Sequence, residues 1–148
     1  PLAAQLAAQA SDMGVDALIV QDLGVVRMLK QAAPDLPLHA STQMSVHSLD
    51  GVKRCADLGF QRVVLSRELS RDQIEYICAR SPVEIETFAH GALCMCYSGQ
   101  CYFSAVIGER SGNRGLCAQP CRLKYGWGNK ADGYPLSLKD ASMVEHLR

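Results

Sequence analysis

Apolar and polar positions alternate in blocks along the first 90 residues and predict helices and strands in turn. Helices are indicated where apolar residues recur at helical spacing, and strands where short apolar runs end in polar residues. The predicted helices cover residues 2–13, 23–33, 48–58 and 70–80, and the predicted strands cover residues 16–22, 36–42, 62–66 and 83–89. Ser48 and Ser70 are the expected N-caps of the last two helices. A strand begins about every 20 to 25 residues, and this βα repeat predicts a parallel sheet with helices outside it.

Continuation of the repeat predicts part of a TIM-like (βα)8 barrel. An open doubly wound sheet is the alternative, but no Gly-x-Gly-x-x-Gly motif supports a dinucleotide-binding version of it. The repeat breaks after the fourth strand, and the next strand is predicted at 136–139, before a helix that starts at Ala141. A connection this long is usually functional or separately stabilised, and we interpret residues 90–134 as a Cys-rich insertion. The whole chain, 1–148, is expected to be a single α/β domain and a fragment of a longer protein.

The amino-acid composition limits the kinds of protein that this chain can be. Hydrophobic residues make up 48% of the chain and charged residues 20%, as in ordinary soluble globular proteins. The formal net charge is zero, so a nucleic-acid partner would have to be bound by a local basic patch. No apolar run is long enough to span a membrane, and no signal peptide is visible. Seven cysteines without a secretory signal favour the reducing cytoplasm, and metal binding or catalysis over disulfides.

Five of the seven cysteines lie within a short stretch of the predicted insertion. Gaps of six, fifteen and three residues separate Cys94, Cys101, Cys117 and Cys121, and Cys96 is a spare thiol. Iron–sulfur clusters accept varied spacings, whereas a structural zinc site usually has two close pairs of ligands. Cys117 and Cys121 form one such pair, and Cys96 with Cys101 could form another. The spacing therefore favours an iron–sulfur cluster over zinc, and disulfides or plain buried thiols are the third alternative.

Three motifs around these cysteines carry a family resemblance. They are Glu-Thr-Phe-Ala-His-Gly-Ala-Leu-Cys at 86–94, Ser-Gly-Gln-Cys-Tyr-Phe-Ser at 98–104, and Arg-Ser-Gly-Asn-Arg-Gly-Leu-Cys-Ala-Gln-Pro-Cys-Arg at 110–122. Together they resemble peptidase family U32, also called the collagenase-like peptidases. The resemblance continues through residues 41–45, 62–69 and 136–140, and so covers nearly the whole chain.

The resemblance implies a [4Fe-4S] cluster with Cys94, Cys101, Cys117 and Cys121 as ligands, although some relatives take the fourth ligand from elsewhere in the chain. It also implies hydroxylation without molecular oxygen, on an RNA pyrimidine or on a quinone precursor. The Cys-Ala-Gln-Pro-Cys-Arg motif is closest to the RNA-hydroxylating branch, so tRNA or rRNA is the expected partner. Prephenate is implied as a co-substrate that supplies the hydroxyl group. The alternatives are a peptidase, as the family name states, and a zinc-stabilised RNA-binding module.

Catalytic candidates lie where predicted strands end, because active sites of parallel α/β folds form there. His90, Lys139 and Asp140 lie at such ends, and the fourth candidate, Glu86, lies within the predicted strand over 83–89. In a continuous strand over 83–89, Glu84 and Glu86 would share a face with His90 directly after it. That face would point into a barrel, with Arg62, Arg67 or Lys139 as ion-pair partners, or into water at a sheet edge.

No His-Glu-x-x-His or Gly-x-Ser-x-Gly motif supports a peptidase, although Cys96 and His90 could form a catalytic pair. Arginines and aromatics gather around the cysteines and suit phosphate contacts and base stacking. The RNA-binding candidates are Arg67, Arg110, Asn113, Arg114 and Arg122. The arginines could equally hold a small dicarboxylate, and the aromatics could simply pack around a cluster. Cys55 and Cys78 lie in predicted helices and are interpreted as small buried hydrophobic residues.

Overall fold

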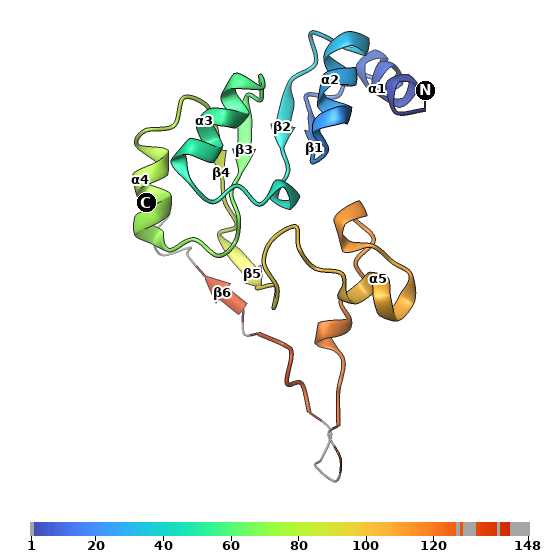
Figure 1. Cartoon of the computed structure of the whole chain (residues 1–148), viewed down its shortest axis with the longest axis vertical. Helices are drawn as coiled ribbons and strands as arrows, with labels where there is room; N and C mark the ends of the chain where they lie inside the picture. Colours follow the sequence, from blue (N-terminus) through green and yellow to red (C-terminus); the bar gives the residue numbers. More distant parts are fainter. Residues whose placement is uncertain (1, 127, 129–132, 139, 143–148) are drawn as a thin grey trace. The chain divides into compact units, whose positions relative to one another are not determined.

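The computed structural model describes residues 2–126, 128, 133–138 and 140–142. The chain forms two compact units, Pro1–Thr87 (unit 1) and Phe88–Arg148 (unit 2), and each is described by itself. Figure 1 shows the helices and strands of both units in chain order. Within the described residues, no helix is both long and apolar enough to cross a membrane.

Unit 1 contains all eight elements that the alternation of apolar and polar positions predicts. Its helices and strands are α1 (Leu2–Asp12), β1 (Leu18–Val20), α2 (Leu23–Ala32), β2 (Leu38–Ala40), the 3-10 helix η1 (Thr42–Met44), α3 (Leu49–Asp57), β3 (Arg62–Val64), α4 (Arg71–Cys78) and β4 (Glu84–Glu86). The strands are shorter than predicted, and two of the residues that follow them are helix caps: Asp22 after β1 caps α2, and Ser41 after β2 caps η1.

The four strands form one parallel sheet in the order β1-β2-β3-β4. The register aligns Val20 with Ala40, Ala40 with Val63, and Val63 with Ile85. These residues therefore form one row on the same face of the sheet. The parallel α/β fold is thus confirmed, and strands adjacent in the chain are neighbours in the sheet. A closed barrel, an insertion over 90–134 and a single domain over 1–148 stay predictions.

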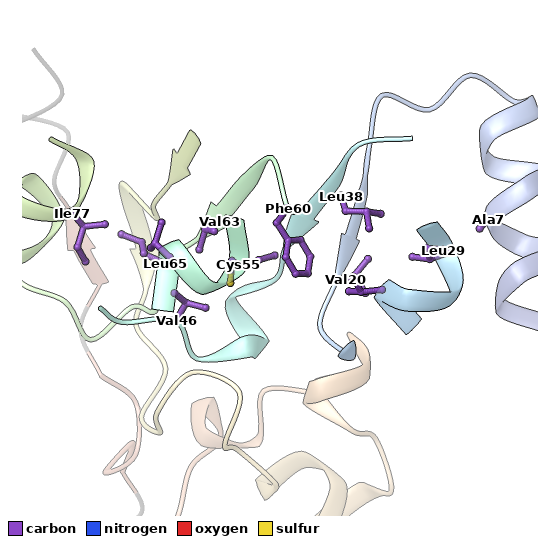
Figure 2. Packing of buried hydrophobic residues seen from close by; sticks show 13 residues of the cluster. Ala7, Val20, Leu29, Leu38, Val46, Cys55, Phe60, Val63, Leu65 and Ile77 are labelled. Atoms are coloured by element: carbon purple, nitrogen blue, oxygen red, sulfur yellow. The ribbon is translucent and has the colours of Figure 1, made fainter. Parts of the chain in front are cut away.

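One face of the sheet packs against the helices and forms the core (Figure 2). Val20, Ala40 and Val63 come from the strands, and Leu29 and Cys55 come from α2 and α3. The opposite face carries a different row of side chains, because side chains alternate along each strand. That row, set by the same register, is Ile19, His39, Arg62 and Glu84. It is mostly polar, and it contains the ion pair between Arg62 and Glu84.

Side-chain caps fix the starts of three helices of unit 1. Asp22 accepts a hydrogen bond from the backbone N–H of Val25 at 2.8 Å, and Ser48 accepts one from Gly51 at 3.1 Å. Ser70 and Gln73 form a capping box at the start of α4. The predicted caps Ser48 and Ser70 are confirmed, and each gives a backbone donor of the first helical turn a partner that the helix itself does not supply.

Unit 2 contains β5 (His90–Ala92), α5 (Phe103–Gly108), the 3-10 helices η2 (Gly112–Arg114) and η3 (Pro120–Arg122), and β6 (Asp140–Ser142). β5 and β6 pair in antiparallel orientation. Three predictions about this part of the chain are corrected. The predicted strand over 83–89 is paired only at Glu84–Glu86, and His90 begins a separate strand. Residues 136–138 form no strand. Residues 141–142 belong to β6 instead of a helix, and Lys139 and residues 143–148 lie outside the described residues.

Candidate functional site

Unit 2 carries five cysteines, four of them in the loops between its short elements. Cys94 and Cys96 follow β5, Cys101 precedes α5, Cys117 follows η2, and Cys121 lies within η3. All five are free thiols; Cys94 and Cys117 are exposed, and the other three are partly buried. The two cysteines of unit 1 differ from these and from each other: Cys55 is buried as predicted, whereas Cys78 is exposed, so the prediction of a buried Cys78 is wrong.

The thiol of Cys121 is influenced by the other three predicted ligands. Burial raises the pKa of the Cys121 thiol, and the positive charge of Arg122 acts in the opposite direction. Negative charge on Cys117, Cys94 and Cys101 raises the pKa of Cys121 further. Charges act on each other mainly within a screening length, which is about 8 Å in physiological salt. The other three thiols that the spacing singled out are therefore near enough for their charges to act on Cys121.

Cys96 belongs to the same group of thiols. Burial is the largest cause that raises the pKa of Cys96, and the charge of Cys101 is the second largest. A hydrogen bond between the two side chains and the charge of Cys94 act in the same direction, while a backbone hydrogen bond from Tyr97 lowers the pKa. Cys96 therefore lies beside Cys101 as a fifth thiol.

Backbone donors and a buried hydroxyl order the loop between Cys117 and Cys121. The N–H of Gln119 donates to Cys117 Sγ at 3.3 Å, and the N–H of Ala118 donates to Ser104 Oγ at 2.9 Å. Gln119 has a left-handed backbone with φ of 54°, and Pro120 after it is buried and opens η3. A left-handed conformation at a residue other than glycine is uncommon and often marks a functional loop. The arrangement turns the loop so that an amide faces the sulfur of Cys117.

Arg122 makes three side-chain hydrogen bonds in unit 2. Its Nη2 donates to the carbonyl oxygen of Leu93 at 2.6 Å. Its Nη1 donates to Leu138 O at 2.7 Å and to Ser137 Oγ at 2.9 Å. The guanidinium thus joins the residue before Cys94, the residue after Cys121 and the segment at 137–138. Sequence analysis missed Leu93, Ser137 and Ser104 as partners, because a backbone carbonyl or a serine has no distinctive signal in the sequence.

The other arginine candidates differ in their surroundings. Arg110 Nε donates to Leu116 O at 3.1 Å and so braces the loop before Cys117. Asn113 and Arg114 lie in η2, where Arg114 is exposed and Asn113 is partly exposed. Arg67 follows β3 in unit 1 and is partly buried. Their predicted contacts with RNA stay predictions.

The catalytic candidates are divided between the two units. Glu86 ends β4 in unit 1, whereas His90 begins β5 in unit 2, where its side chain is exposed. Asp140 lies in β6 and pairs with Ala92 through the strand, and Lys139 lies outside the described residues. The strand that was expected to carry Glu86 and end beside His90 is therefore interrupted, and a joint catalytic role for these residues stays a prediction.

Glu84 and Glu86 share one cation. Arg62 Nη2 lies 2.7 Å from Glu84 Oε2, and Arg62 Nη1 lies 3.4 Å from Glu86 Oε2. Arg62 was one of the three partners that the sequence indicated for these carboxylates. The hydrogen bond to Glu84 is the main reason why the pKa of Arg62 is raised.

A single metal ion has no preformed site in the part of the chain that the structure describes. No group of three or more His, Cys, Asp or Glu side chains is arranged there to hold one ion. The fit of a metal centre therefore rests on the chemistry of the donor set, which consists of four free thiols in unit 2. Four thiols are the usual donors of a [4Fe-4S] cluster, and they also suit zinc.

The comparisons with known proteins agree on one protein family. The sequence model of peptidase family U32 matches residues 1–148. The chain is 47% identical to the 23S rRNA 5-hydroxycytidine C2501 synthase of Escherichia coli (strain K12), over 90% of this chain and 21% of that protein. It is 44% identical to tRNA hydroxylation protein P of the same organism, over 77% of this chain and 25% of that protein.

Two further matches belong to the peptidase side of the family. The chain is 36% identical to a collagenase of Porphyromonas gingivalis (strain ATCC BAA-308 / W83), over 85% of this chain and 32% of that protein. The solved structure of the U32 peptidase Mk0906 matches 58% of this chain and 35% of its own, at 27% identity and a TM-score of 0.49. The chain spans between about a fifth and a third of the length of these curated relatives.

Proposed function

The chain belongs to peptidase family U32, and from this we propose that it carries the cysteine centre of an enzyme that hydroxylates an RNA pyrimidine. The proposal includes an iron–sulfur cofactor, a tRNA or rRNA substrate and independence from molecular oxygen. The observation that carries it is the 47% identity with the 23S rRNA 5-hydroxycytidine C2501 synthase over 90% of this chain. A cytoplasmic location is part of the proposal, because the cytosol keeps thiols reduced.

Four cysteines would hold the cofactor. Cys94, Cys101, Cys117 and Cys121 offer the thiolates that a [4Fe-4S] cluster requires, and Cys96 is the extra thiol beside them. When bound, such a cluster supplies one-electron redox chemistry. The N–H of Gln119 would donate to the sulfur of Cys117 in the loaded protein as it does here, and hydrogen bonds to ligand sulfurs tune the potential of a cluster.

Exposed aromatics near the cysteines support an RNA-facing surface. Tyr97 is 72% exposed and Tyr102 is 63% exposed, so their rings are accessible to unpaired bases. Arg114 is exposed close by in the chain and would contact phosphate. Arg110 or Arg114 would equally bind the carboxylates of a co-substrate such as prephenate, since guanidinium pairs with carboxylate in a fork.

The test is anaerobic purification of the whole protein, followed by its visible spectrum and by iron and sulfide analysis. We expect a brown protein whose absorption disappears in Cys94→Ala and Cys117→Ala. The matched control is Cys78→Ala, which removes an exposed thiol of unit 1 and should leave the colour unchanged. Mass spectrometry of tRNA and rRNA nucleosides, from cells that carry each variant as the only copy, should show loss of hydroxylation in the first two variants only. A colourless protein that holds zinc would reject the redox proposal and favour the RNA-binding module.

A peptidase is the second candidate, and the observation that favours it is the 36% identity with the collagenase. It predicts that the purified protein cleaves gelatin or collagen peptides without RNA. Cys96→Ala or His90→Ala should then abolish cleavage, because these are the residues suited to a Cys–His pair. Cleavage that survives both changes would exclude this pair as the catalytic group.

A further inference from the structure

The guanidinium of Arg122 lies at a junction of three chain segments in unit 2. Two of its acceptors are backbone carbonyl oxygens, Leu93 O at 2.6 Å and Leu138 O at 2.7 Å. The third is Ser137 Oγ at 2.9 Å. These partners are separated from Arg122 by 29, 16 and 15 positions along the chain, so the contacts are not local.

Two of the three joined segments carry cysteines of the candidate metal centre. Leu93 directly precedes Cys94, and Arg122 directly follows Cys121. A hydrogen bond between Arg122 and the Leu93 carbonyl therefore links the backbone next to the first thiol with the backbone next to the last. Cys94 is exposed, so little packing holds its side chain in place. The short hydrogen bond from Arg122 restrains the backbone directly before it.

From this junction we propose that Arg122 is a positioning residue for the cysteine centre. It holds Cys94 and Cys121 at a fixed separation while the cofactor is assembled, and it does not act as an RNA contact. The inference rests on the proposed function, because a metal centre is what needs the two thiols together. It goes further by giving a role to a residue that binds neither metal nor substrate.

The chemistry of the side chain explains why arginine occupies this position. A planar guanidinium offers five N–H donors in fixed directions, so it can serve carbonyl groups on both sides at once. Lysine would keep the charge, but its compact ammonium lacks the fixed fork. Outer groups that orient metal ligands matter strongly, and their loss typically lowers metal affinity by about 10-fold to 100-fold.

Two variants of the whole protein, purified anaerobically, separate the contribution of the Arg122 charge from that of its hydrogen-bond geometry. Arg122→Lys keeps the charge, and Arg122→Ala removes both. The matched controls are Arg114→Lys and Arg114→Ala, because Arg114 is exposed and no side-chain hydrogen bond or ion pair is recorded for it in the described part of the chain. Both Arg122 variants should lose iron to a chelator about 10 times faster than the wild type, or more. The reduced cluster of Arg122→Lys should also give a shifted electron paramagnetic resonance spectrum. Both Arg114 variants should match the wild type in each measurement.

A second measurement does not depend on the cluster. Amide hydrogen exchange of the metal-free protein should rise in Arg122→Ala across residues 90–96 and 136–138, and should stay unchanged in Arg114→Ala. Wild-type iron retention, an unshifted spectrum and unchanged exchange in the Arg122 variants would overturn the inference and leave the proposed function standing. If the wild type holds no iron, the proposed function fails, and the exchange data alone decide whether Arg122 ties the two cysteine segments together.

Discussion

Ionisation of the Cys55 thiol in α3 is coupled to folding. Its side chain is 3% exposed, and burial raises the pKa of the thiol above its ordinary value. Between the pKa of the unfolded thiol, about 8.5, and the higher folded pKa, the unfolded state binds fewer protons than the folded state. The free energy of unfolding must therefore fall as the pH rises through this window. Below about pH 8 the thiol is protonated in both states and the contribution of Cys55 is fully present.

The measurement is urea unfolding of the reduced protein at pH 7 and at pH 9.5. Cys55→Ala should be less stable than the wild type at pH 7, because it leaves a small cavity, but should lose less stability at the higher pH. Cys78→Ala serves as the control, since Cys78 is exposed on α4, and its pH dependence should equal that of the wild type. An equal pH dependence in all three proteins would show that Cys55 ionises as easily in the folded state as in the unfolded state.

The contrast between Cys55 and Cys78 shows what the sequence can predict for single residues. Both lie in helices, but Ile74 and Ile77 set the core-facing side of α4. Ile74, Ile77 and Cys78 are spaced as i, i+3 and i+4, which places all three toward one side of a helix. Cys78 is nevertheless exposed, and it is the last residue of α4, so helical periodicity alone would not have separated the two thiols. No periodicity leads to Arg122 and Leu93, whose contact joins residues 29 positions apart.

The start of α4 depends on a reciprocal pair of hydrogen bonds. Gln73 N–H donates to Ser70 Oγ at 3.4 Å, and Ser70 N–H donates to Gln73 Oε1 at 2.8 Å. Ser70→Ala should lower the free energy of unfolding by about 1 kcal/mol, because a backbone donor of the first turn loses its acceptor. The double variant Ser70→Ala with Gln73→Ala should cost less than the sum of the single variants, since the two bonds form one motif.

Urea unfolding of unit 1 measures this effect, and the control is Ser81→Ala. The Ser81 hydroxyl bonds within its own turn, to the backbone of Val83, so its change should be additive with Gln73→Ala. Strict additivity of the Ser70 and Gln73 changes would contradict a cooperative cap.

Elements of the βα repeat could be predicted because their signals are local. Apolar runs and Ser caps within a few residues of each helix define α3 and α4, and the structure confirms both. The cysteine segment follows no such repeat. Its turns depend on a left-handed Gln119 and on the contacts of Arg122 with residues 137–138. The pairing of β6 with β5 likewise joins segments about 50 residues apart, and local patterns do not encode such pairing.

At the scale of the whole chain, net charge limits how RNA could be bound. The formal net charge is zero, so no long-range field draws a polyanion to the molecule. Binding would depend on the local basic side chains of unit 2. The sequence places Arg110, Arg114, Arg122 and Lys124 near the cysteines, and the structure uses the guanidinium of Arg122 for internal contacts. At most a few phosphates can then be neutralised.

The salt dependence of RNA binding should therefore be shallow. Each phosphate neutralised on a single strand contributes about −0.7 to the slope of log K against log salt, so contacts from the three remaining basic side chains give a slope of about −2. Fluorescence anisotropy with a labelled single-stranded RNA over a range of KCl concentrations measures this slope. Arg114→Ala should reduce its magnitude by about 0.7, since one contact is lost. Arg27→Ala, an exposed arginine on α2 of unit 1, should leave it unchanged. A much steeper slope, or equal slopes for both variants, would place the RNA on a basic surface other than that of unit 2.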